Sequence, residues 1–408
     1  METQYVMDVN SERILPHVDA AAVKSNDSDF ILQTYGRLPV TFVKGSGMTL
    51  WDTEGNEYLD FLGGIAVNGV GHCHPTVVRA IQEQASTLIH TSNLYYTEPG
   101  ATLAKKLVSV SDADRVFFCN SGAEANEAAI KIARKYGKSN GRADKFNIVT
   151  AVRSFHGRTM ATVTATGQPK YREPFEPMIP GFHYVPFNDL DALSQAVNDE
   201  TCAVLLEPIQ GEGGVYPADQ EFLDLASSLC KQHDALLIFD EIQTGMGRTG
   251  KWWAYQHYGV IPDIMTVAKA LGGGVPIGAL LARGAAATTL VPGDHGTTFG
   301  GNPLATRTAL AVIEAMENEH LIENAHAMGA YFTERLRSLG DKLSDIRALG
   351  LMVGVDLTEP DAKRVQSEAL RRGLIVNAIG DHTLRFLPPL IVKQPDIDRA
   401  ISILASVV

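Results

Sequence analysis

The stretch RVFFCNSGAEANEAAIKIARKYG, residues 115–137, decides the fold class. Its beginning, 115–120, is a short and mostly apolar run that predicts a buried strand. Residues 123–137 place alanine and isoleucine at helical spacing and end on a glycine, which predicts an amphipathic helix. Alternation of buried strands with covering helices is typical of an α/β domain with a mostly parallel sheet.

The same alternation continues through the middle of the chain. Further apolar runs predict strands at FNIVTAV (146–152), AVLLEPI (203–209), ALLIFDEI (235–242), IMTVA (264–268) and IGALLA (277–282). Helical patterns such as QEFLDLASSLCKQHD (220–234) separate several of these runs. We therefore expect an α/β fold, in which a large domain has a mostly parallel sheet flanked by helices and a smaller domain is α+β. The expected divisions are an N-terminal segment that joins the small domain (1–74), the large domain (75–303) and the C-terminal small domain (304–408).

Composition limits the classes of partner. The chain has 408 residues, of which 45% are hydrophobic and 20% charged, and its formal net charge is −12. Because no basic block offsets it, this acidic balance argues against nucleic acid or an anionic membrane surface as the main partner. The longest apolar runs are about six residues, far too short to cross a membrane.

Cysteine usage favours a reducing compartment. Cys73, Cys119, Cys202 and Cys230 lack CxxC spacing, and three of them lie in or beside apolar runs, as small core residues do. The N-terminal stretch carries several acids and resembles neither a secretory signal nor a transit peptide, so we expect a cytoplasmic protein. The HCH sequence at 72–74 is not expected to bind a metal, because adjacent side chains do not easily surround one ion.

Polar residues gather where the predicted strands end. Asn120–Gly122, Glu207, Asp240 and Lys269 all lie at such positions. Ligands of open parallel sheets bind beyond the carboxyl ends of the strands. A single lysine at the end of an apolar run is more often a solvated charge than a reactive amine. The location that Lys269 shares with the other polar residues favours a functional role for it.

Two segments are candidates for binding a phosphate. Ser121, Gly122 and Ala123 lie at the predicted helix start, where backbone N–H groups can hold an anion, although Ser121 alone is explained equally well as a helix cap. The second segment, GMGRTGKW (245–252), matches the spacing of a nucleotide-binding loop. We reject it because Trp252 occupies the position of the required serine or threonine.

Two adjacent acids have different interpretations. Asp240 and Glu241 would face opposite sides of a strand, so they do not form an acid/base pair. Asp240 ends an apolar run, where an unpaired carboxylate would be costly. It therefore needs a structural cation, a set of hydrogen bonds, or a cofactor nitrogen that it keeps protonated.

Four other residues allow both a structural and a functional interpretation. Phe155 is either a core residue or a face for a planar cofactor, and Arg158 is either a surface cation or a ligand for a carboxylate. Glu212 and Arg385 are a loop acid and a strand arginine, and spacing alone does not join them.

Longer motifs carry a resemblance to a known family. These motifs are LWDTEGNEYLDFLGGIAVNGVGHCHP, TSNLYYTEP, FFCNSGAEANEAAIKIARKYG, FHGRT, EPIQGEGGV, LLIFDEIQTGMGRTG, AKALGGGVPIGA and HGTTFGGNPLA. From about Tyr35 to the C-terminus the sequence resembles the class III, ω-type aminotransferases that use pyridoxal phosphate, and within them the acetylornithine aminotransferases. The interval from Asp240 to Lys269 also matches the family pattern. The resemblance implies fold type I, with pyridoxal phosphate bound by the domain at 75–303.

The resemblance assigns cofactor roles to individual residues. Lys269 is implied to bind pyridoxal phosphate covalently and, once freed, to move the substrate proton, and Asp240 to hold the ring nitrogen protonated. The other implied contacts are Phe155 and Ile242 on the two ring faces, Gln243 on the phenolic oxygen, Ser121, Gly122 and Ala123 on the phosphate, and Thr298 on the phosphate of a neighbouring subunit. The active sites would then lie at the interface of a homodimer.

The resemblance also assigns substrate contacts. Arg385 is implied to bind an α-carboxylate, and Glu212 to pair with this arginine in one half-reaction and swing away in the other. Arg158 would bind a second carboxylate, and Tyr35 lies where the family contacts its substrate. Ile65 stands where ornithine aminotransferases have a tyrosine, which favours an acylated donor over plain ornithine.

The implied reaction is a ping-pong transamination of arginine biosynthesis. The δ-amino group of N2-acetyl-L-ornithine passes to 2-oxoglutarate, which gives N-acetyl-L-glutamate 5-semialdehyde and L-glutamate. Succinylornithine, succinyldiaminopimelate, ornithine and 4-aminobutyrate remain alternative donors, because acyl selectivity depends on a few loop contacts. The Glu212/Arg385 pair speaks against an aminomutase or decarboxylase on the same scaffold, and Lys269 with Asp240 speaks against a cofactor-free homologue.

Overall fold

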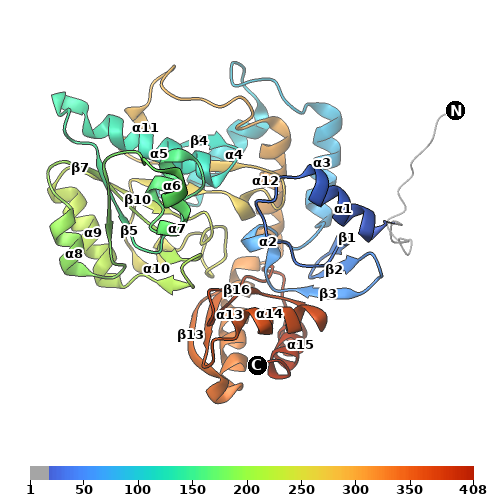
Figure 1. The fold of residues 1–408 in the computed structure, drawn as a ribbon. Coiled ribbons are helices and arrows are strands. Elements are labelled where there is room, and N and C mark those ends of the chain that lie inside the picture. The colour runs from blue at the N-terminus through green and yellow to red at the C-terminus, as the bar shows by residue number, and fades with distance from the viewer. Residues whose placement is uncertain (1–17) are drawn as a thin grey trace.

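A seven-stranded central sheet forms the middle of the molecule (Figure 1). The computed structural model describes residues 18–408. The strands of the central sheet are β4 (Arg115–Cys119), β5 (Asn147–Ala151), β6 (Phe182–Val185), β7 (Thr201–Leu206), β10 (Leu236–Asp240), β11 (Ile264–Val267) and β12 (Gly278–Ala282), in the order β4-β12-β11-β10-β7-β5-β6. Only β12 runs antiparallel to its neighbours. The predicted mostly parallel sheet is confirmed, and β6 is the strand that the sequence patterns missed.

Helices cover both faces of this sheet, as buried parallel strands require. Along β10, Leu237 and Phe239 pack into one apolar cluster, whereas Leu236 and Ile238 pack into another. The helices packed around the central sheet are α3 (Pro75–Thr87), α4 (Glu98–Ser109), α5 (Gly122–Gly137), α6 (Met160–Ala165), α7 (Pro169–Arg172), α8 (Leu190–Ala196), α9 (Gln220–Gln232), α10 (Tyr255–Tyr258), α11 (Ala286–Thr289) and α12 (Pro303–Asn318). The alternation of side chains on each strand therefore places one set of apolar residues under each helical layer.

The two ends of the chain meet in a second sheet. Strands β1 (Phe42–Ser46), β2 (Thr49–Asp52) and β3 (Glu57–Asp60) are antiparallel, and β15 (Leu374–Ile375) pairs parallel to β3. In Figure 1 the blue N-terminal strands accordingly lie next to the C-terminal part. Two short helices, α1 (Ala20–Phe30) and α2 (Gly63–Ala66), flank the N-terminal strands in sequence.

A third sheet, which we call the C-terminal sheet, is antiparallel. Its order is β13 (Leu343–Leu349), β14 (Met352–Leu357), β17 (Thr383–Phe386) and β16 (Asn377–Ile379). The helices of this part are α13 (Leu321–Arg337), α14 (Ala362–Arg371) and α15 (Gln394–Ala405). The domain boundaries given above stay a prediction.

Several smaller expectations can be compared with the fold. Cys119, Cys202 and Cys230 are buried and Cys73 is exposed, and all four are free thiols. His72 and His74 bond to different acids, Asp60 and Glu319, and no group of three or more His, Cys, Asp or Glu side chains within residues 18–408 is arranged to hold a metal. Over the same range no helix is both long and apolar enough to cross a bilayer. The prediction about a leader segment concerns residues 1–22, of which residues 1–17 lie outside the described part.

Candidate active site

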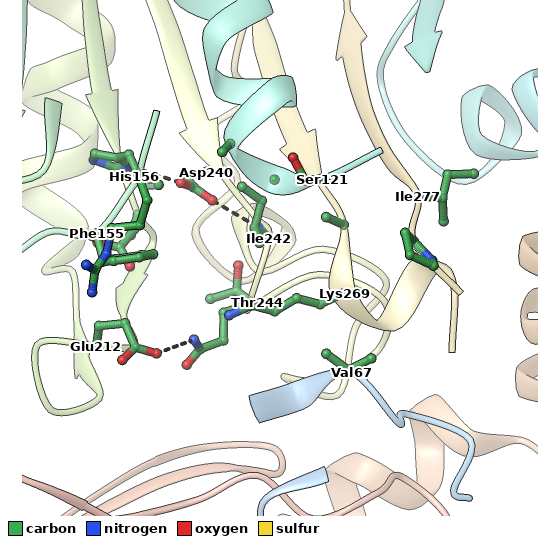
Figure 2. A pocket seen from close by; sticks show the side chains of 18 of the residues that line it. Val67, Ser121, Phe155, His156, Glu212, Asp240, Ile242, Thr244, Lys269 and Ile277 are labelled. Atoms are coloured by element: carbon green, nitrogen blue, oxygen red, sulfur yellow. Dashed lines mark hydrogen bonds and ion pairs between the residues drawn. The ribbon is translucent and has the colours of Figure 1, made fainter. Parts of the chain in front are cut away.

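A cavity of about 400 Å³ opens at the carboxyl edge of the central sheet (Figure 2). Polar residues that follow β4, β7, β10 and β11 all line it, as their positions at strand ends predicted. Of the residues assigned from the sequence, it is lined by Ser121, Gly122, Ala123, Phe155, Arg158, Glu212, Asp240, Ile242, Gln243 and Lys269. Segments far apart in the chain thus converge on one site.

The start of α5 forms an anion-binding end of the cavity. The Ser121 hydroxyl accepts from the Glu124 N–H at 3.2 Å and caps the helix, while the first N–H groups of an α-helix have no acceptor within it. The Glu124 carboxylate is turned away and accepts from the Asn120 backbone N–H at 2.6 Å. A Cβ on Gly122 would lie 2.6 Å from the Ile242 side chain, so glycine is needed for this close approach. Both interpretations of Ser121 are therefore compatible, because a capping hydroxyl still has its own proton to donate.

Asp240 is fixed at the bottom of the cavity by hydrogen bonds. Its side chain is 5% exposed, and its Oδ2 accepts from Asn126 Nδ2 at 2.7 Å and from His156 Nδ1 at 2.8 Å. Its Oδ1 accepts from the Ile242 N–H at 3.1 Å (Figure 2). The sequence left a cation, a set of hydrogen bonds or a cofactor nitrogen open for this carboxylate; the structure shows a set of hydrogen bonds, whose two side-chain donors the sequence did not identify.

The two missed donors are themselves held in place. Thr266 Oγ1 donates to Asn126 Oδ1 at 2.8 Å, and His156 Nε2 lies 3.2 Å from Thr150 Oγ1. Asn126 could have been identified from the sequence, because it is a polar residue within an alanine-rich helix. It is fully buried in the structure, where a polar side chain needs a hydrogen-bond partner. The result is an Asp240 carboxylate whose orientation is set before any ligand binds.

Glu241 faces the other side of β10. It accepts from the backbone N–H groups of Ala254 at 2.9 Å and Tyr255 at 2.8 Å, and from the Thr244 hydroxyl. Burial raises the pKa of Glu241 to about 7. The prediction that Asp240 and Glu241 do not form an acid/base pair is confirmed.

Lys269 stands where β11 ends, at the first residue of a short 3₁₀ turn (Lys269–Leu271). Its backbone has φ of +47°, an uncommon value for a residue other than glycine. Figure 2 shows its side chain extending from the strand end into the cavity. Burial lowers the pKa of Lys269, although Glu212 acts in the opposite direction, so the neutral amine is favoured relative to an exposed lysine.

Glu212, Arg385 and Gln243 form a connected group that we call the carboxylate gate. Arg385 Nη1 donates to Glu212 Oε1 at 2.5 Å and to Gln243 Oε1 at 3.2 Å, and Gln243 Nε2 donates to Glu212 Oε1 at 3.2 Å (Figure 2 draws the Glu212–Gln243 bond). Arg385 Nη2 donates to Asn377 Oδ1 at 2.7 Å, and its buried Nε has no hydrogen-bond partner among residues 18–408. Burial would raise the pKa of Glu212, but Arg385 and Lys269 outweigh it and lower the pKa. The structure thus joins two residues that spacing left apart.

The side of the cavity that holds Phe155 contains a buried acid. Glu207 accepts from the Phe155 N–H at 3.0 Å and from the Gly211 N–H at 3.4 Å, and burial together with Asp240 raises its pKa well above the usual range. The Arg158 guanidinium is exposed and lies 4.0 Å from the centroid of the Tyr171 ring. Arg158 is therefore free to meet a ligand from the solvent side.

Three assigned residues do not line the cavity of this single chain: Arg385, which reaches it through Glu212 and Gln243, Tyr35 and Thr298. Tyr35 is 73% exposed and Thr298 is also exposed. The neighbouring Thr297 accepts from Asn120 Nδ2 at 3.1 Å, so the loop of Thr298 lies beside the anion-binding end. Ile65 is 37% exposed and has φ of +64°, in the turn just before Val67, which does line the cavity.

Comparison with known proteins gives a consistent result. The family model described as "Aminotransferase class-III" matches residues 31–408. The acetylornithine aminotransferase of Methanocaldococcus jannaschii is 52% identical over 385 residues, which is 93% of this chain and 96% of that protein.

Solved structures show the same similarity. The N-acetylornithine aminotransferase of Stenotrophomonas maltophilia is 39% identical with a TM-score of 0.81, over 94% of this chain and 97% of that one. The ornithine aminotransferase of Toxoplasma gondii is 33% identical with a TM-score of 0.91, over 95% of this chain and 94% of that one. The chain belongs to the class-III aminotransferases, and the family resemblance and fold class are confirmed.

Class-III aminotransferases use pyridoxal phosphate, and the residues present fit this cofactor. The start of α5 offers backbone N–H groups for a phosphate, and the space beside Gly122 would be filled by a Cβ. Asp240 offers a fixed carboxylate for a cationic ring nitrogen, and Lys269 offers an amine for the carbonyl carbon. The individual residue roles stay proposals. The Gln243 amide donates to Glu212 and accepts from Arg385 in this structure, and a primary amide nitrogen has a second N–H for a phenolic oxygen.

Proposed function

We propose that this class-III aminotransferase transfers the δ-amino group of N2-acetyl-L-ornithine to 2-oxoglutarate, giving N-acetyl-L-glutamate 5-semialdehyde and L-glutamate. The observation that carries the proposal is the contact between Glu212 and Arg385 at the edge of a cavity that holds Lys269. An enzyme that alternates between an ω-amine donor and an α-keto acid needs an arginine that can be masked and exposed. The names of the relatives that are 52% and 39% identical to this chain support the acetylated donor.

The sheet-edge residues divide the chemistry among themselves. Bound pyridoxal phosphate supplies an electrophilic carbon and an electron-accepting ring. Asp240 would hold the ring nitrogen in its cationic form, because its carboxylate is oriented by Asn126 and His156. Lys269 holds the cofactor through its amine and, when free, removes the substrate proton at Nζ and returns it, a role that its lowered pKa favours. Phe155 and Ile242 confine the ring from two sides of the cavity.

The carboxylate gate distinguishes the two substrates. With Glu212 bound, Arg385 is neutralised, and an acylornithine donor can present its δ-amine without its α-carboxylate being drawn to the arginine. With Glu212 turned away, Arg385 is free to bind the α-carboxylate of 2-oxoglutarate through two parallel hydrogen bonds. Arg158, exposed at the other side of the cavity, binds the second carboxylate. Ile65, an exposed apolar residue two positions before the lining residue Val67, suits an uncharged acylamide better than a charged group.

We further propose that the enzyme is a homodimer with shared active sites. Leu94, Tyr96 and Phe299 are exposed large apolar side chains, at 84%, 107% and 61%. Asn93 Nδ2 donates to the carbonyl groups of Thr297 at 3.1 Å and Gly300 at 2.9 Å. These bonds join the loop of Asn93 to the loop of Thr297 next to the anion-binding end. A second copy of the chain would cover this surface, and Thr298 would complete its phosphate site. A cytoplasmic location also stays a proposal, with which the free cysteines accord.

A panel of amine donors tests the proposed reaction. Acetylornithine, succinylornithine, ornithine and 4-aminobutyrate are each supplied with 2-oxoglutarate, and glutamate formation is measured. We expect the highest kcat/KM for acetylornithine. A higher kcat/KM for another donor would identify that donor, rather than acetylornithine, as the substrate. Absence of glutamate formation from every donor would contradict the transaminase proposal.

Mixing two inactive variants tests the shared site. A heterodimer of Lys269→Ala and Thr298→Ala subunits contains one site with both residues intact if Thr298 acts on the partner. We expect that site to recover wild-type cofactor affinity and turnover. No recovery in a confirmed heterodimer would place Thr298 outside the partner's site.

A further inference from the structure

The hairpin that carries Glu212 is short and is held by a side chain from another sheet. Its strands, β8 (Ile209–Gln210) and β9 (Tyr216–Pro217), have two residues each. Arg347 of β13 donates from Nε and Nη2 to the carbonyl oxygen of Gly214, at 3.2 and 2.9 Å. Its guanidinium also lies 4.2 Å from the centroid of the Tyr216 ring. Arg347 therefore contacts the hairpin at Gly214 and Tyr216, two and four residues after Glu212.

Arg347 is itself anchored on the C-terminal sheet. Its Nη1 and Nη2 donate to the two carboxylate oxygens of Asp356, at 2.7 and 2.8 Å, and Nη1 also bonds to Asp345. The Arg347 side chain is only 9% exposed. Burial would lower the pKa of Arg347, but the hydrogen bonds to Asp356 and Asp345 outweigh it and raise the pKa. A bidentate, buried guanidinium of this kind has one geometry, so it can act as a fixed support.

The same sheet carries Arg385 in register with Arg347. Gly354 on β14 is paired with Arg347 on one side and with Arg385 on the other. A Cβ on Gly354 would lie 2.8 Å from the Gly214 carbonyl oxygen, so the hairpin packs directly onto the sheet at this glycine. Thr383, two residues before Arg385, also donates to Asp356 at 2.6 Å. The Glu212 hairpin thus sits between two arginines, one that holds its backbone and one that meets its carboxylate.

We propose that Arg347 is a positioning residue for the carboxylate gate, which keeps Glu212 within reach of Arg385 and so sets the preference between acylornithine and glutamate as amine donors. This inference rests on the proposed function, in which paired Arg385 serves the acylornithine half-reaction. If Arg347 releases Gly214, Glu212 loses its fixed distance from Arg385. Arg385 is then exposed more of the time, and ligands that offer an α-carboxylate near the cofactor gain.

A double-mutant cycle on the cofactor-loaded enzyme tests this role. Single-turnover absorbance changes give kcat/KM for acetylornithine and for glutamate in the wild type, Arg347→Met, Glu212→Ala and the double variant. We expect Arg347→Met to lower the acetylornithine-to-glutamate ratio about tenfold, the order of one hydrogen bond to a charged group. In the Glu212→Ala background the same substitution should leave the ratio unchanged, because the group it positions is gone.

Two further variants separate positioning from a general structural effect. Arg153→Met is the matched control, because the Arg153 guanidinium lies 4.7 Å from the same Tyr216 ring and no bond from it to Gly214 occurs among residues 18–408. We expect its ratio to stay at the wild-type value. Arg347→Lys keeps the charge and one donor, so it should recover part of the ratio, and it provides the comparison if Arg347→Met does not fold.

The possible outcomes are distinct. Equal slowing of both donors by Arg347→Met, or a change of ratio that persists without Glu212, would overturn the proposal and leave Arg347 a purely structural residue. If the wild type rejects acetylornithine, the proposed substrate is wrong. The Arg347 prediction is then measured with whichever ω-amine donor of the panel is accepted, again as a ratio to glutamate.

Discussion

The sheet-edge residues Asp240 and Lys269 and the carboxylate gate contribute to one cavity but are built differently. Asp240 and Lys269 stand at the ends of neighbouring strands of the central sheet. Asp240 is held by three hydrogen bonds, one from α5 and two from the segments that follow β5 and β10. In the gate, Glu212 lies on a hairpin whose strands have two residues each, and Arg385 lies on the C-terminal sheet, 173 positions further along the sequence. The first arrangement is preorganised for a cofactor that stays. The second joins separate sheets through the hydrogen bonds among Glu212, Gln243 and Arg385, which suits the opening and closing that we propose for it.

The difference predicts that sheet-edge substitutions affect every substrate, whereas gate substitutions affect substrates unequally. We give four tests of this comparison, from the largest expected effect to the smallest.

Lys269→Ala should remove transamination with both donors, by about 10⁴-fold, because Lys269 is the one lysine among the described residues that line the cavity. The visible absorbance band of the lysine-bound cofactor should disappear. Residual binding of pyridoxal phosphate measured by calorimetry serves as the control that the cavity is intact. Appreciable turnover with a persisting band would show that Lys269 is not the cofactor lysine.

Asp240→Asn should slow both half-reactions to a similar extent. The amide is neutral and no longer stabilises a cationic ring nitrogen, so we expect a loss of about 3 kcal/mol in barrier stabilisation, roughly a hundredfold in rate. Rates are measured at matched cofactor occupancy. An effect on one donor only would contradict the distinction between the two regions.

Glu241→Gln should change stability and its pH dependence while turnover per folded molecule stays the same. The pKa of Glu241 is raised from 4.5 to about 7 in the folded state, so the stability that this carboxyl contributes is fully present below pH 4.5 and lost as the pH rises through about 7. The difference is at most about 3 kcal/mol.

Urea unfolding of both proteins between pH 5 and pH 8 measures this effect. The glutamine variant should gain stability relative to the wild type as the pH rises, since it has no proton to lose. A stability difference that does not depend on pH would refute the assignment of a raised pKa.

Glu212→Ala should act on the gate alone. Arg385 then stays free, so glutamate should gain over acetylornithine by about 1.5–3 kcal/mol, the order of one charged hydrogen bond. Separate half-reactions monitored by stopped-flow absorbance provide the measurement. If both half-reactions slow equally, Glu212 is a structural acid of the hairpin and the gate does not exist.

The sequence by itself determined the fold class and the sheet-edge site. Strand and helix periodicity are local properties, and the polarity of a parallel sheet brings residues that end neighbouring strands to one edge. Asn120–Gly122, Glu207, Asp240 and Lys269 therefore met as predicted. The one strand of the central sheet that the sequence patterns missed also has a local explanation. β6 (Phe182–Val185) is a short edge strand that is only partly buried, so it lacks the apolar run that marks the other strands.

Tertiary structure alone decided which side chains support the site and how the gate is joined. Asn126 and Asp240 are 114 positions apart, and Arg347 reaches Gly214 across 133. Such partners depend on strand register and on how one sheet packs against another, and these follow from the balance of many contacts over the whole molecule. Family motifs named Glu212 and Arg385, but only the folded chain shows that Gln243 joins them and that Arg347 holds the hairpin between the two sheets. A local sequence pattern specifies whether a segment forms a strand or a helix. A hydrogen bond between distant segments forms only when tertiary packing has set the distance between them.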